Sequence, residues 1–374
     1  MLKCIKRIVA AEKKDNWGEK MIKECEENVV LQEDMEELVN SGCLFDDLKG
    51  NTVFVTGATG LIGSQIVKAL ACANRLKDSH IRILAFVRSE EKARKVFGSL
   101  LDRGDVSLVF GDVNREIETG ENVDYVIHGA SATSSRFFVT NPVETILTAL
   151  EGTKNILEFA RGKAVKGMVY LSSLEVYGVP GTEDGRVTEK DYGYMDPMSV
   201  RSSYSEGKRM VECLCASYAS EYGVPVKVAR LSQTFGAGVE YNDGRVFAEF
   251  ARCAVEKRNI VLHTAGNTLR SYCYTKDAVS ALLYILVKGN AGEAYNVTNE
   301  DTAVTIREMA QCVCDTFPES GISVEFDMPG DLASFGYNPE MVIRLDSSRL
   351  KALGWQPTVG LRDMFVRMIQ GFGK

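Results

Sequence analysis

Histidine is scarce in this chain, which limits the metal sites that the sequence can form. Only three histidines occur among 374 residues, so a zinc site would depend on the ten cysteines and the carboxylates. Zinc ligands usually occur as cysteines and histidines at short, fixed spacings. The closely spaced pairs, Cys213 with Cys215 and Cys312 with Cys314, have no histidine beside them. We therefore predict no metal site, and cysteines that are reduced and mostly packed.

Long apolar segments and an excess of basic residues are also missing. The longest apolar run, residues 281–287, is much shorter than the roughly 20 residues that a membrane helix needs. Residues 1–20 lack the apolar core of a signal peptide. The 44 basic and 51 acidic side chains give a net charge of −7, which disfavours nucleic acid or an anionic membrane as the main partner. We expect a cytoplasmic protein with no nucleic-acid or membrane partner.

From residue 50 onward, short apolar runs alternate with helical patterns. This alternation is typical of a parallel β-sheet that is covered by helices. The candidate strands are residues 53–56, 81–87, 107–110, 125–128, 167–172 and 226–231. The candidate helices are residues 61–73, 143–160 and 202–222. The sequence therefore predicts an α/β fold with a doubly wound parallel sheet.

Residues 1–48 form a charged extension that precedes this alternation. Apolar residues recur at roughly helical spacing over residues 31–39, so we expect one or two amphipathic helices. These helices either brace the domain that follows or make an oligomer contact, and the sequence leaves both open.

Three glycines follow the first predicted strand and lead into the first predicted helix. In this context the first glycine permits a tight turn, the second lets backbone N–H groups approach a pyrophosphate, and the third lets the helix pack on the sheet. The helix N-terminus then faces the negative charge. We predict a dinucleotide site whose contacts are Gly57, Thr59, Gly60, Leu61, Ile62 and Gly63.

Tyr204 and Lys208 lie four residues apart in the predicted helix 202–222, and therefore on the same face. A tyrosine can act as a base near neutral pH only if positive charge stabilises its phenolate. A lysine ammonium and a nicotinamide ring would supply this charge. We predict that Tyr204 and Lys208 are catalytic and also contact the cofactor.

The glycine spacing G-x-x-G-x-x-G and the Tyr204-x-x-x-Lys208 motif resemble the short-chain dehydrogenase/reductase superfamily. The resemblance is strongest to its extended branch, which works on nucleotide sugars, and it covers about residues 50–370. It implies a Rossmann-like fold with a smaller C-terminal substrate-binding region. We accordingly expect a helical extension (1–48), a Rossmann domain that carries the catalytic residues (49–232) and a mainly substrate-binding region (233–374), of which about 260–300 returns to the Rossmann domain.

The resemblance also indicates further cofactor contacts. Residues 111–113 are similar to the adenine-binding segment of the family, and residues 128–131 to the strand end that lies along the cofactor. It therefore implies cofactor contacts at Asp112, Val113 and Ala130, and a substrate contact at Ser131.

The end of the second predicted strand leaves the choice of nicotinamide cofactor open. NAD-binding relatives usually have an acidic residue there, which accepts the ribose hydroxyls, whereas this chain has Arg88. Arg88 can pair with the 2′-phosphate of NADP, or it can stack on adenine while Ser89 or Glu90 meets the ribose. We predict NAD, with NADP as the alternative, because family members that recycle their cofactor mostly use NAD.

Residues 169–178 resemble the S-S/T-x-x-V-Y-G segment of extended family members. The resemblance places Ser173 on the hydroxyl that binds the reacting oxygen of the sugar. It implies that Tyr204 removes a proton from the C4 hydroxyl while a hydride passes to the nicotinamide. The resulting 4-keto sugar can then be epimerised, dehydrated or decarboxylated.

Glu175 and Leu174 bear on the choice among these outcomes. By resemblance, dTDP-glucose 4,6-dehydratases carry an Asp-Glu pair here, whereas UDP-glucuronate decarboxylases keep only the glutamate. Leu174 replaces the aspartate, which argues against loss of water. Residues 204–212 and 228–236 also look most like the decarboxylase group. Glu175 is predicted to be catalytic, and the alternative is that its carboxylate only orients backbone.

The substrate side departs from the relatives. Gln233 and Glu249 stand where asparagine is usual, whereas Arg270 matches the family arginine that grips the diphosphate. A guanidinium suits that task because it forms paired hydrogen bonds to phosphate oxygens. We predict that Gln233, Glu249 and Arg270 bind substrate. Because Glu249 brings negative charge near the expected base site, the nucleotide base stays undefined.

The sequence therefore predicts an enzyme that oxidises a nucleotide sugar transiently at C4 and then decarboxylates or epimerises it with cofactor recycling. One alternative is an NADPH-dependent carbonyl or 4-keto-sugar reductase, which Arg88 would suit. Another is a catalytically inactive cofactor-binding regulator, against which Ser173, Tyr204 and Lys208 argue. Relatives commonly dimerise through two helices that correspond to residues 143–160 and 202–222, so a homodimer is expected.

Overall fold

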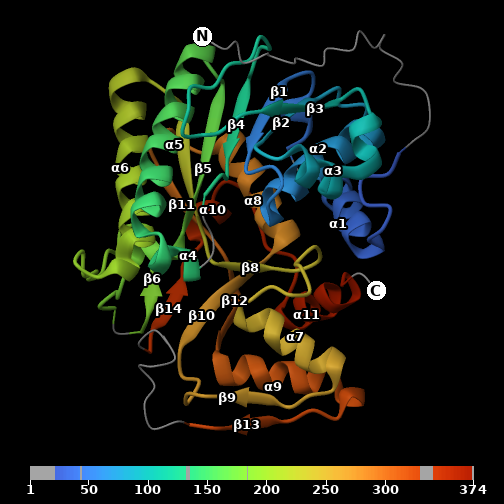
Figure 1. Ribbon diagram of the computed structural model, residues 1–374, viewed down its shortest axis with the longest axis vertical. Coiled ribbons are helices and arrows are strands. Elements are labelled where there is room, and N and C mark those ends of the chain that lie inside the picture. Colours follow the sequence, from blue (N-terminus) through green and yellow to red (C-terminus); the bar gives the residue numbers. More distant parts are fainter. Residues whose placement is uncertain (1–21, 43, 132–134, 183, 329–339, 373–374) are drawn as a thin grey trace.

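The computed structural model describes residues 22–42, 44–131, 135–182, 184–328 and 340–372. Figure 1 shows a large sheet flanked by helices, with a smaller group of strands and helices from the C-terminal part of the chain beyond one end of it. The beginning of the predicted N-terminal extension lies outside the described residues. Among the helices described, none is long and apolar enough to cross a membrane.

Seven parallel strands form the main sheet, in the order β11-β7-β5-β4-β1-β2-β3. The strand order reverses between β1 and β4, and folds of this kind bind ligands at the carboxyl ends of the strands near that point. The prediction of a Rossmann-like, doubly wound parallel sheet is confirmed. Its strands are β1 (Thr52–Thr56), β2 (Arg82–Val87), β3 (Val106–Phe110), β4 (Tyr125–His128), β5 (Gly167–Ser173), β7 (Val226–Leu231) and β11 (Ala294–Val297).

Helices cover both faces of the main sheet. Side chains alternate between the faces along each strand, so Val53 and Val55 of β1 join the core under α2 and α8, whereas Phe54 joins the core under α5 and α6. The covering helices are α2 (Leu61–Lys77), α3 (Glu90–Phe97) and α8 (Thr275–Lys288) on one side, and α5 (Pro142–Lys163) and α6 (Ser203–Tyr222) on the other. Short helical turns join the elements: η1 (Asp46–Leu48), η2 (Gly98–Asp102), η3 (Leu174–Tyr177), η4 (Val200–Ser202), η5 (Pro318–Ser320) and α4 (Ser135–Thr140).

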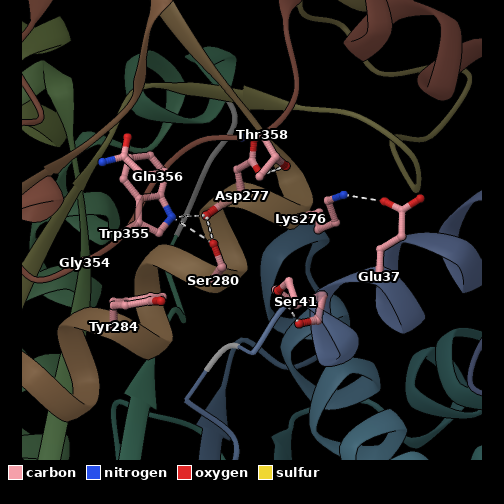
Figure 2. A pocket seen from close by; sticks show the side chains of 11 residues that line it. Glu37, Ser41, Lys276, Asp277, Ser280, Tyr284, Gly354, Trp355, Gln356 and Thr358 are labelled. Carbon is pink, nitrogen blue, oxygen red and sulfur yellow. Dashed lines mark hydrogen bonds and ion pairs between the residues drawn. The ribbon is translucent and has the colours of Figure 1, made fainter.

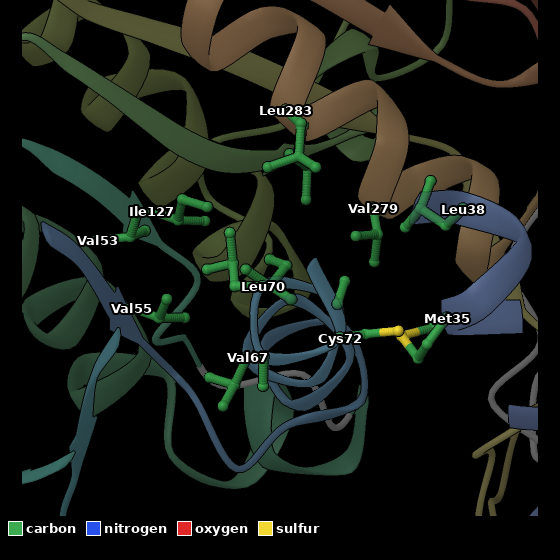
Figure 3. Packing of buried hydrophobic residues seen from close by; sticks show 14 of the residues in the cluster. Met35, Leu38, Val53, Val55, Val67, Leu70, Cys72, Ile127, Val279 and Leu283 are labelled. Carbon is green, nitrogen blue, oxygen red and sulfur yellow. The ribbon is translucent and has the colours of Figure 1, made fainter. Parts of the chain in front are cut away.

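The N-terminal helix α1 (Val29–Asn40) packs its apolar face on α2 and α8, and the predicted amphipathic helix is therefore present. Figure 3 shows Met35 next to Cys72 of α2 and Leu38 next to Val279 of α8. All four side chains belong to the buried core. The apolar face of α1 is thus covered within the chain, which favours the bracing interpretation of the extension over an oligomer contact.

The C-terminal part, together with the short strand β6 that precedes α6, forms a smaller sheet in the order β12-β10-β14-β6, with β8 paired to β10, and a separate pair of β9 with β13. Its strands are β6 (Arg186–Val187), β8 (Gln233–Phe235), β9 (Ile260–Leu262), β10 (Leu269–Tyr274), β12 (Asn299–Thr305), β13 (Val324–Phe326) and β14 (Val342–Leu345). Its helices are α7 (Val246–Glu256), α9 (Ile306–Thr316), α10 (Ser348–Lys351) and α11 (Leu361–Gln370). Between these elements, β11 returns to pair with β7 of the main sheet. The division of the chain into domains stays a prediction.

Candidate active site

The glycine loop between β1 and α2 leaves no room for side chains at two positions. Gly57 has φ +66°, and a Cβ there would lie 2.6 Å from the backbone carbon of Gly129. A Cβ at Gly63 would lie 2.2 Å from the carbonyl oxygen of Gly57. Gly60 is the N-cap of α2, and Thr59, Leu61 and Ile62 are half-buried around it. The loop is therefore built as a backbone cradle at a helix N-terminus, which suits a dinucleotide pyrophosphate.

The neighbouring strand ends complete this edge of the sheet. The Thr56 hydroxyl accepts a hydrogen bond from the Ala130 backbone N–H at 3.2 Å and contacts Nδ1 of His128 at 2.7 Å. Ala130 and Ser131 are half-buried after β4. After β3, the Asp112 carboxylate accepts a hydrogen bond from the Asn114 N–H at 2.9 Å, and Val113 is buried. The structure thus brings the predicted cofactor residues to the carboxyl edge of the strands.

Arg88 lies exposed at the end of β2, and its neighbours are already engaged. The Ser89 hydroxyl caps α3 by accepting a hydrogen bond from the Lys92 N–H at 3.1 Å. Glu90 forms an ion pair with Arg94 at 2.7 Å. Arg88 itself forms no ion pair among the described residues. Arg88, Ser89 and Glu90 were the candidates for binding the cofactor ribose. Ser89 and Glu90 bond with residues of α3, whereas Arg88 forms no such bond in the described part of the chain.

Lys208 is buried on α6, one turn after Tyr204. Its Nζ donates a hydrogen bond to the carbonyl oxygen of Leu171 at 2.7 Å and lies 5.7 Å from the centre of the Tyr204 ring. Burial lowers the pKa of Lys208 to about 8. His128 also faces this ammonium, and burial lowers the pKa of His128 to about 3, so the imidazole is neutral. Because this pKa lies close to neutral pH, a bound ligand can change the protonation state of Lys208.

Tyr204 is not acidified by the protein alone. Burial raises the pKa of Tyr204 to about 12, the charge of Glu175 adds to this rise, and a hydrogen bond with Ser173 opposes it. A phenol of this kind keeps its proton at neutral pH until further positive charge arrives. The structure thus pairs Tyr204 with Ser173, and the stabilisation of its phenolate by Lys208 together with a bound nicotinamide stays a prediction.

The two consecutive serines at the end of β5 have different partners. The buried Ser172 hydroxyl donates a hydrogen bond to the Glu212 carboxylate at 2.5 Å. The Ser173 hydroxyl caps η3, where it accepts a hydrogen bond from the Glu175 N–H at 3.3 Å, and it bonds with Tyr204. Ser173 is therefore the hydroxyl that lies at the tyrosine.

Three residues near Tyr204 were missed by the sequence analysis: Arg201, Phe138 and Ser205. Arg201 Nη1 lies 3.3 Å from the Glu175 carboxylate, and the Ser205 hydroxyl donates a hydrogen bond to the same group at 3.1 Å. The Phe138 ring stacks on the Tyr204 ring with 4.2 Å between centres. Arg201 precedes Tyr204 by three residues, and this spacing was the one signal available in the sequence.

The predicted substrate residues lie on the C-terminal elements. Arg270 of β10 has a buried Nε without a hydrogen-bond partner among the described residues, and its Nη2 lies 3.9 Å from the sulfur of Met341. Gln233 begins β8 and is half-buried. The Glu249 carboxylate of α7 bonds with Arg252 and Arg258 at 2.5 and 3.3 Å, and these guanidinium groups hold its pKa below the usual range. Among the described residues, Nε of Arg270 is thus left without a hydrogen-bond partner, whereas Glu249 is held by neighbouring arginines.

A cavity of about 200 Å³ lies where α1 and α8 meet residues 354–358, and none of the predicted site residues lines it. Figure 2 shows several of its polar side chains bonded to neighbouring groups. Trp355 Nε1 donates to the Ser280 hydroxyl at 2.8 Å, and Lys276 pairs with Glu37 at 2.5 Å. The cavity is therefore a gap between packed elements and not the candidate active site.

Comparison with known proteins decides the family. Residues 53–298 match the NAD dependent epimerase/dehydratase family. The chain belongs to this family. It is 30% identical to UDP-glucuronic acid decarboxylase 6 of Arabidopsis thaliana over 321 residues, which cover 86% of this chain and 88% of that protein. It is 29% identical to UDP-glucuronic acid decarboxylase 1 of Danio rerio over 323 residues, which cover 86% of this chain and 72% of that protein.

Solved structures of epimerases and dehydratases share the fold. UDP-glucose 4-epimerase of Thermotoga maritima, solved with UDP-glucose, superposes with a TM-score of 0.72 at 20% identity, and the match covers 86% of this chain and 98% of that one. dTDP-glucose 4,6-dehydratase of Bacillus anthracis, solved with NAD, gives a TM-score of 0.68 at 20% identity over 86% and 96% of the two chains. The predictions of the family, the fold and an enzyme that uses a nicotinamide dinucleotide are confirmed. The roles of individual residues stay predictions.

Proposed function

We propose that this member of the epimerase/dehydratase family oxidises a nucleotide sugar transiently at C4, then decarboxylates or epimerises it and returns the hydride. The observation that carries the proposal is the group at the end of β5. There the Tyr204 hydroxyl bonds with Ser173, and buried Lys208 lies one helical turn away. The glycine cradle follows β1 at the same edge of the sheet.

The residues present can carry the proton transfers of this reaction. A dinucleotide bound over the glycine cradle would supply a hydride acceptor and positive charge. Ser173 then holds the reacting oxygen of the sugar, and Tyr204 takes the proton from the C4 hydroxyl. Lys208, protonated below a pKa of about 8, stabilises the phenolate through its charge. Because burial raises the pKa of Tyr204 to about 12 in the protein alone, the tyrosine serves as a base only in the loaded enzyme.

Leu174 supports decarboxylation or epimerisation over loss of water. Its side chain is buried in a small cluster with Val176, Val187 and Ile343. A leucine that packs in this way cannot protonate a leaving hydroxyl. The similarity to proteins named UDP-glucuronic acid decarboxylases makes a nucleotide-bound sugar acid the first substrate to test.

Arg270 supports a substrate that carries a diphosphate. A buried guanidinium N–H without a partner costs free energy, and Nε of Arg270 is such a group among the described residues. A phosphate oxygen would satisfy it with a charge-assisted hydrogen bond. We therefore propose that Arg270 binds the diphosphate, and we propose no particular base because Glu249 already bonds with two arginines.

Mass spectrometry of incubations with UDP-, CDP-, GDP- and dTDP-sugars, including UDP-glucuronate, tests the proposal. Loss of carbon dioxide from a uronate substrate is the expected result, and a new sugar of unchanged mass would indicate epimerisation. Loss of water would contradict the inference from Leu174. Absence of any product from the whole panel would contradict the proposed function.

NAD is the proposed cofactor because the family is described as NAD dependent. One observation favours NADP as the second candidate. Arg88 is exposed at the end of β2, whereas Ser89 caps α3 and Glu90 pairs with Arg94. Dissociation constants of NAD and NADP, measured for the wild type and for Arg88→Ala, decide between them. An NADP preference that Arg88→Ala removes would assign the 2′-phosphate to Arg88, and net consumption of NADPH would favour a reductase.

The proposed assembly is a homodimer through α5 and α6, which pack against each other and leave apolar side chains exposed. Val143 and Leu147 on α5 are 60% and 43% exposed, and Met210 on α6 is 57% exposed. Light scattering should give the mass of a dimer, and Met210→Glu should shift it toward the monomer. Met198→Glu, at an 88% exposed position outside both helices, is the control. A wild-type monomer at micromolar concentration would contradict the proposal.

A further inference from the structure

The carboxylate of Glu175 is held by Arg201 of η4 and by Ser205 in the first turn of α6. Arg201 approaches it with both terminal nitrogens, Nη1 at 3.3 Å and Nη2 at 3.4 Å from its two oxygens. The Ser205 hydroxyl donates a further hydrogen bond at 3.1 Å. Both side chains of the ion pair are about three-quarters buried, at 29% and 24% exposure, so solvent screens this pair less than a surface pair.

The same arginine contacts the aromatic ring that packs on Tyr204. The Arg201 guanidinium lies 5.3 Å from the centre of the Phe138 ring. The Phe138 ring stacks on the Tyr204 ring, with 4.2 Å between the ring centres and an interplanar angle of 13°. The Ser203 hydroxyl donates a hydrogen bond to the carbonyl oxygen of Phe138 at 3.0 Å and so ties α4 to the start of α6. Arg201 is therefore in contact with both the acid and the ring that surround the tyrosine.

Charged and titratable groups face Tyr204 from several elements. They are Glu175 on η3, Arg201 on η4, Lys208 on α6 and Tyr170 on β5. On α4 the charged residue is Arg136, which is exposed. The charge of Glu175 raises the pKa of Tyr204, and the charge of Arg201 lowers it. The acid and the arginine thus act on the phenol in opposite directions.

We propose that Arg201 is a positioning residue of the proposed active site: it binds the Glu175 carboxylate and thereby limits how strongly that charge holds the proton on Tyr204. The inference rests on the proposed function, in which Tyr204 is the base. Without Arg201, the carboxylate would face the developing phenolate uncompensated, and like charges at short range disfavour each other. A lysine at this position would keep the positive charge beside the carboxylate, with a single contact in place of the paired one, and should therefore preserve most of the effect.

The direct test follows the ionisation of Tyr204 by NMR of the full chain labelled with ¹³C at the tyrosine ζ carbon, with Tyr204→Phe to assign the signal. Glu175→Gln should lower the titration midpoint by about one pH unit. Arg201→Met should raise it, so that Tyr204 stays protonated at the highest pH at which the variant is folded. Arg201→Lys should stay near the wild type. The double variant Arg201→Met/Glu175→Gln should return toward the wild type, because the charge that Arg201 offsets is then absent.

A matched control removes the same charge elsewhere. Arg82→Met disrupts the exposed pair between Arg82 and Glu121, in which both side chains are 44% exposed, at the amino end of β2. It should leave the Tyr204 midpoint unchanged. Far-ultraviolet circular dichroism at the pH of each measurement shows whether a variant is folded. If Arg201→Met does not fold, the other two variants test the inference. Glu175→Gln must then lower the Tyr204 midpoint, and Arg201→Lys must keep the wild-type midpoint.

A second readout uses the substrate identified by the mass-spectrometric panel. The acid limb of kcat/KM against pH should move to higher pH in Arg201→Met, which would lower kcat/KM about tenfold on that limb. An unmoved limb with a raised KM would show that Arg201 contacts substrate instead and would overturn the inference. So would a midpoint shift no larger than that of Arg82→Met. The proposed function would fail separately, if Tyr204→Phe kept wild-type turnover.

Discussion

Among the groups in which a tyrosine lies near an acid and an arginine, two differ in what bonds to the tyrosine hydroxyl. In one group, Tyr274 donates a hydrogen bond at 2.5 Å to Asp34 of α1, and Arg367 of α11 lies 2.7 Å from the same carboxylate. In the other, the Tyr204 hydroxyl bonds with Ser173, while Arg201 and Ser205 hold the acid, Glu175.

The difference separates a structural group from one suited to chemistry. Asp34 is fully buried, and burial raises its pKa to about 6. Burial raises the pKa of Tyr274 far above its ordinary value, and the charge of Asp34 and the hydrogen bond to it add to this rise. That hydroxyl is committed to joining α1 to the C-terminal helix. Tyr204 has instead a neutral serine partner and a buried ammonium nearby, so its proton can be exchanged with a ligand.

The largest effect should come from removing each hydroxyl in turn. Tyr204→Phe should lower kcat by about 10²- to 10⁴-fold, the contribution of a general base, and leave dinucleotide binding nearly intact. Tyr274→Phe should leave kcat within a few-fold but lower the free energy of unfolding by about 1–3 kcal/mol, because buried Asp34 loses a partner. Steady-state kinetics and urea unfolding measure the two effects. Equal kinetic losses in both variants would remove the distinction.

The lysines of the two groups should also behave differently with pH. Because the pKa of Lys208 is lowered to about 8, its ammonium is lost above pH 8, and turnover should fall there as the phenolate loses its stabilising charge. Lys208→Met should lose about 10²-fold in kcat and abolish this basic limb. Lys276→Met, which breaks the ion pair with Glu37 beside the Asp34 group, should keep the limb. A basic limb that survives in Lys208→Met would contradict the assignment.

Asp34 should give the structural group its own pH dependence of stability. Its pKa is about 6 in the folded protein and 3.8 in the reference state, so between pH 4 and 6 the folded protein binds more protons. The contribution of Asp34 to the free energy of unfolding therefore decreases as pH rises through this window, by up to about 3 kcal/mol. Asp34→Asn should lack this decrease when unfolding is followed at pH 4, 5 and 6. Parallel curves for the two proteins would disprove it.

The smallest effect should come from Ser205. Ser205→Ala removes one of the hydrogen bonds on Glu175 but leaves the ion pair with Arg201. A hydrogen bond to a charged group contributes about 1.5–3 kcal/mol. Because Arg201 still holds the carboxylate, we expect only a few-fold decrease in kcat/KM and a decrease of about 1 kcal/mol in the free energy of unfolding. A decrease as large as that of Tyr204→Phe would place Ser205 in contact with the reacting atoms, contrary to the present assignment.

The parts of the site that could be predicted from the sequence are those that local spacing determines. The positions of Gly57, Gly60 and Gly63 relative to a strand and a helix specify the cradle, and the interval from Tyr204 to Lys208 specifies one helix face. The apolar runs likewise predicted the main-sheet strands other than β11 within one residue of their bounds. In each case the structure depends on residues that are neighbours along the chain.

Contacts between distant segments could not be predicted. Tyr274 and Asp34 are 240 residues apart, and Arg367 and Asp34 are 333 apart, so no local pattern links them. Arg201 meets Phe138 and Glu175 only because α4 and η3 pack beside the start of α6. The short strands β6, β8 and β14 have two to four residues each and depend on pairing with other strands. Such contacts arise from the completed fold.

The most direct test of the central claim is hydride transfer at C4 itself. The sugar nucleotide that the enzyme turns over would be supplied with deuterium on C4, and its turnover and product would be compared with those of the unlabelled sugar. The account predicts slower turnover and a product that still carries the deuterium, because the abstracted hydride is returned. The account would be contradicted by a product that has lost its deuterium to the cofactor pool. It would also be contradicted if the label left the rate unchanged and Tyr204→Phe stayed active.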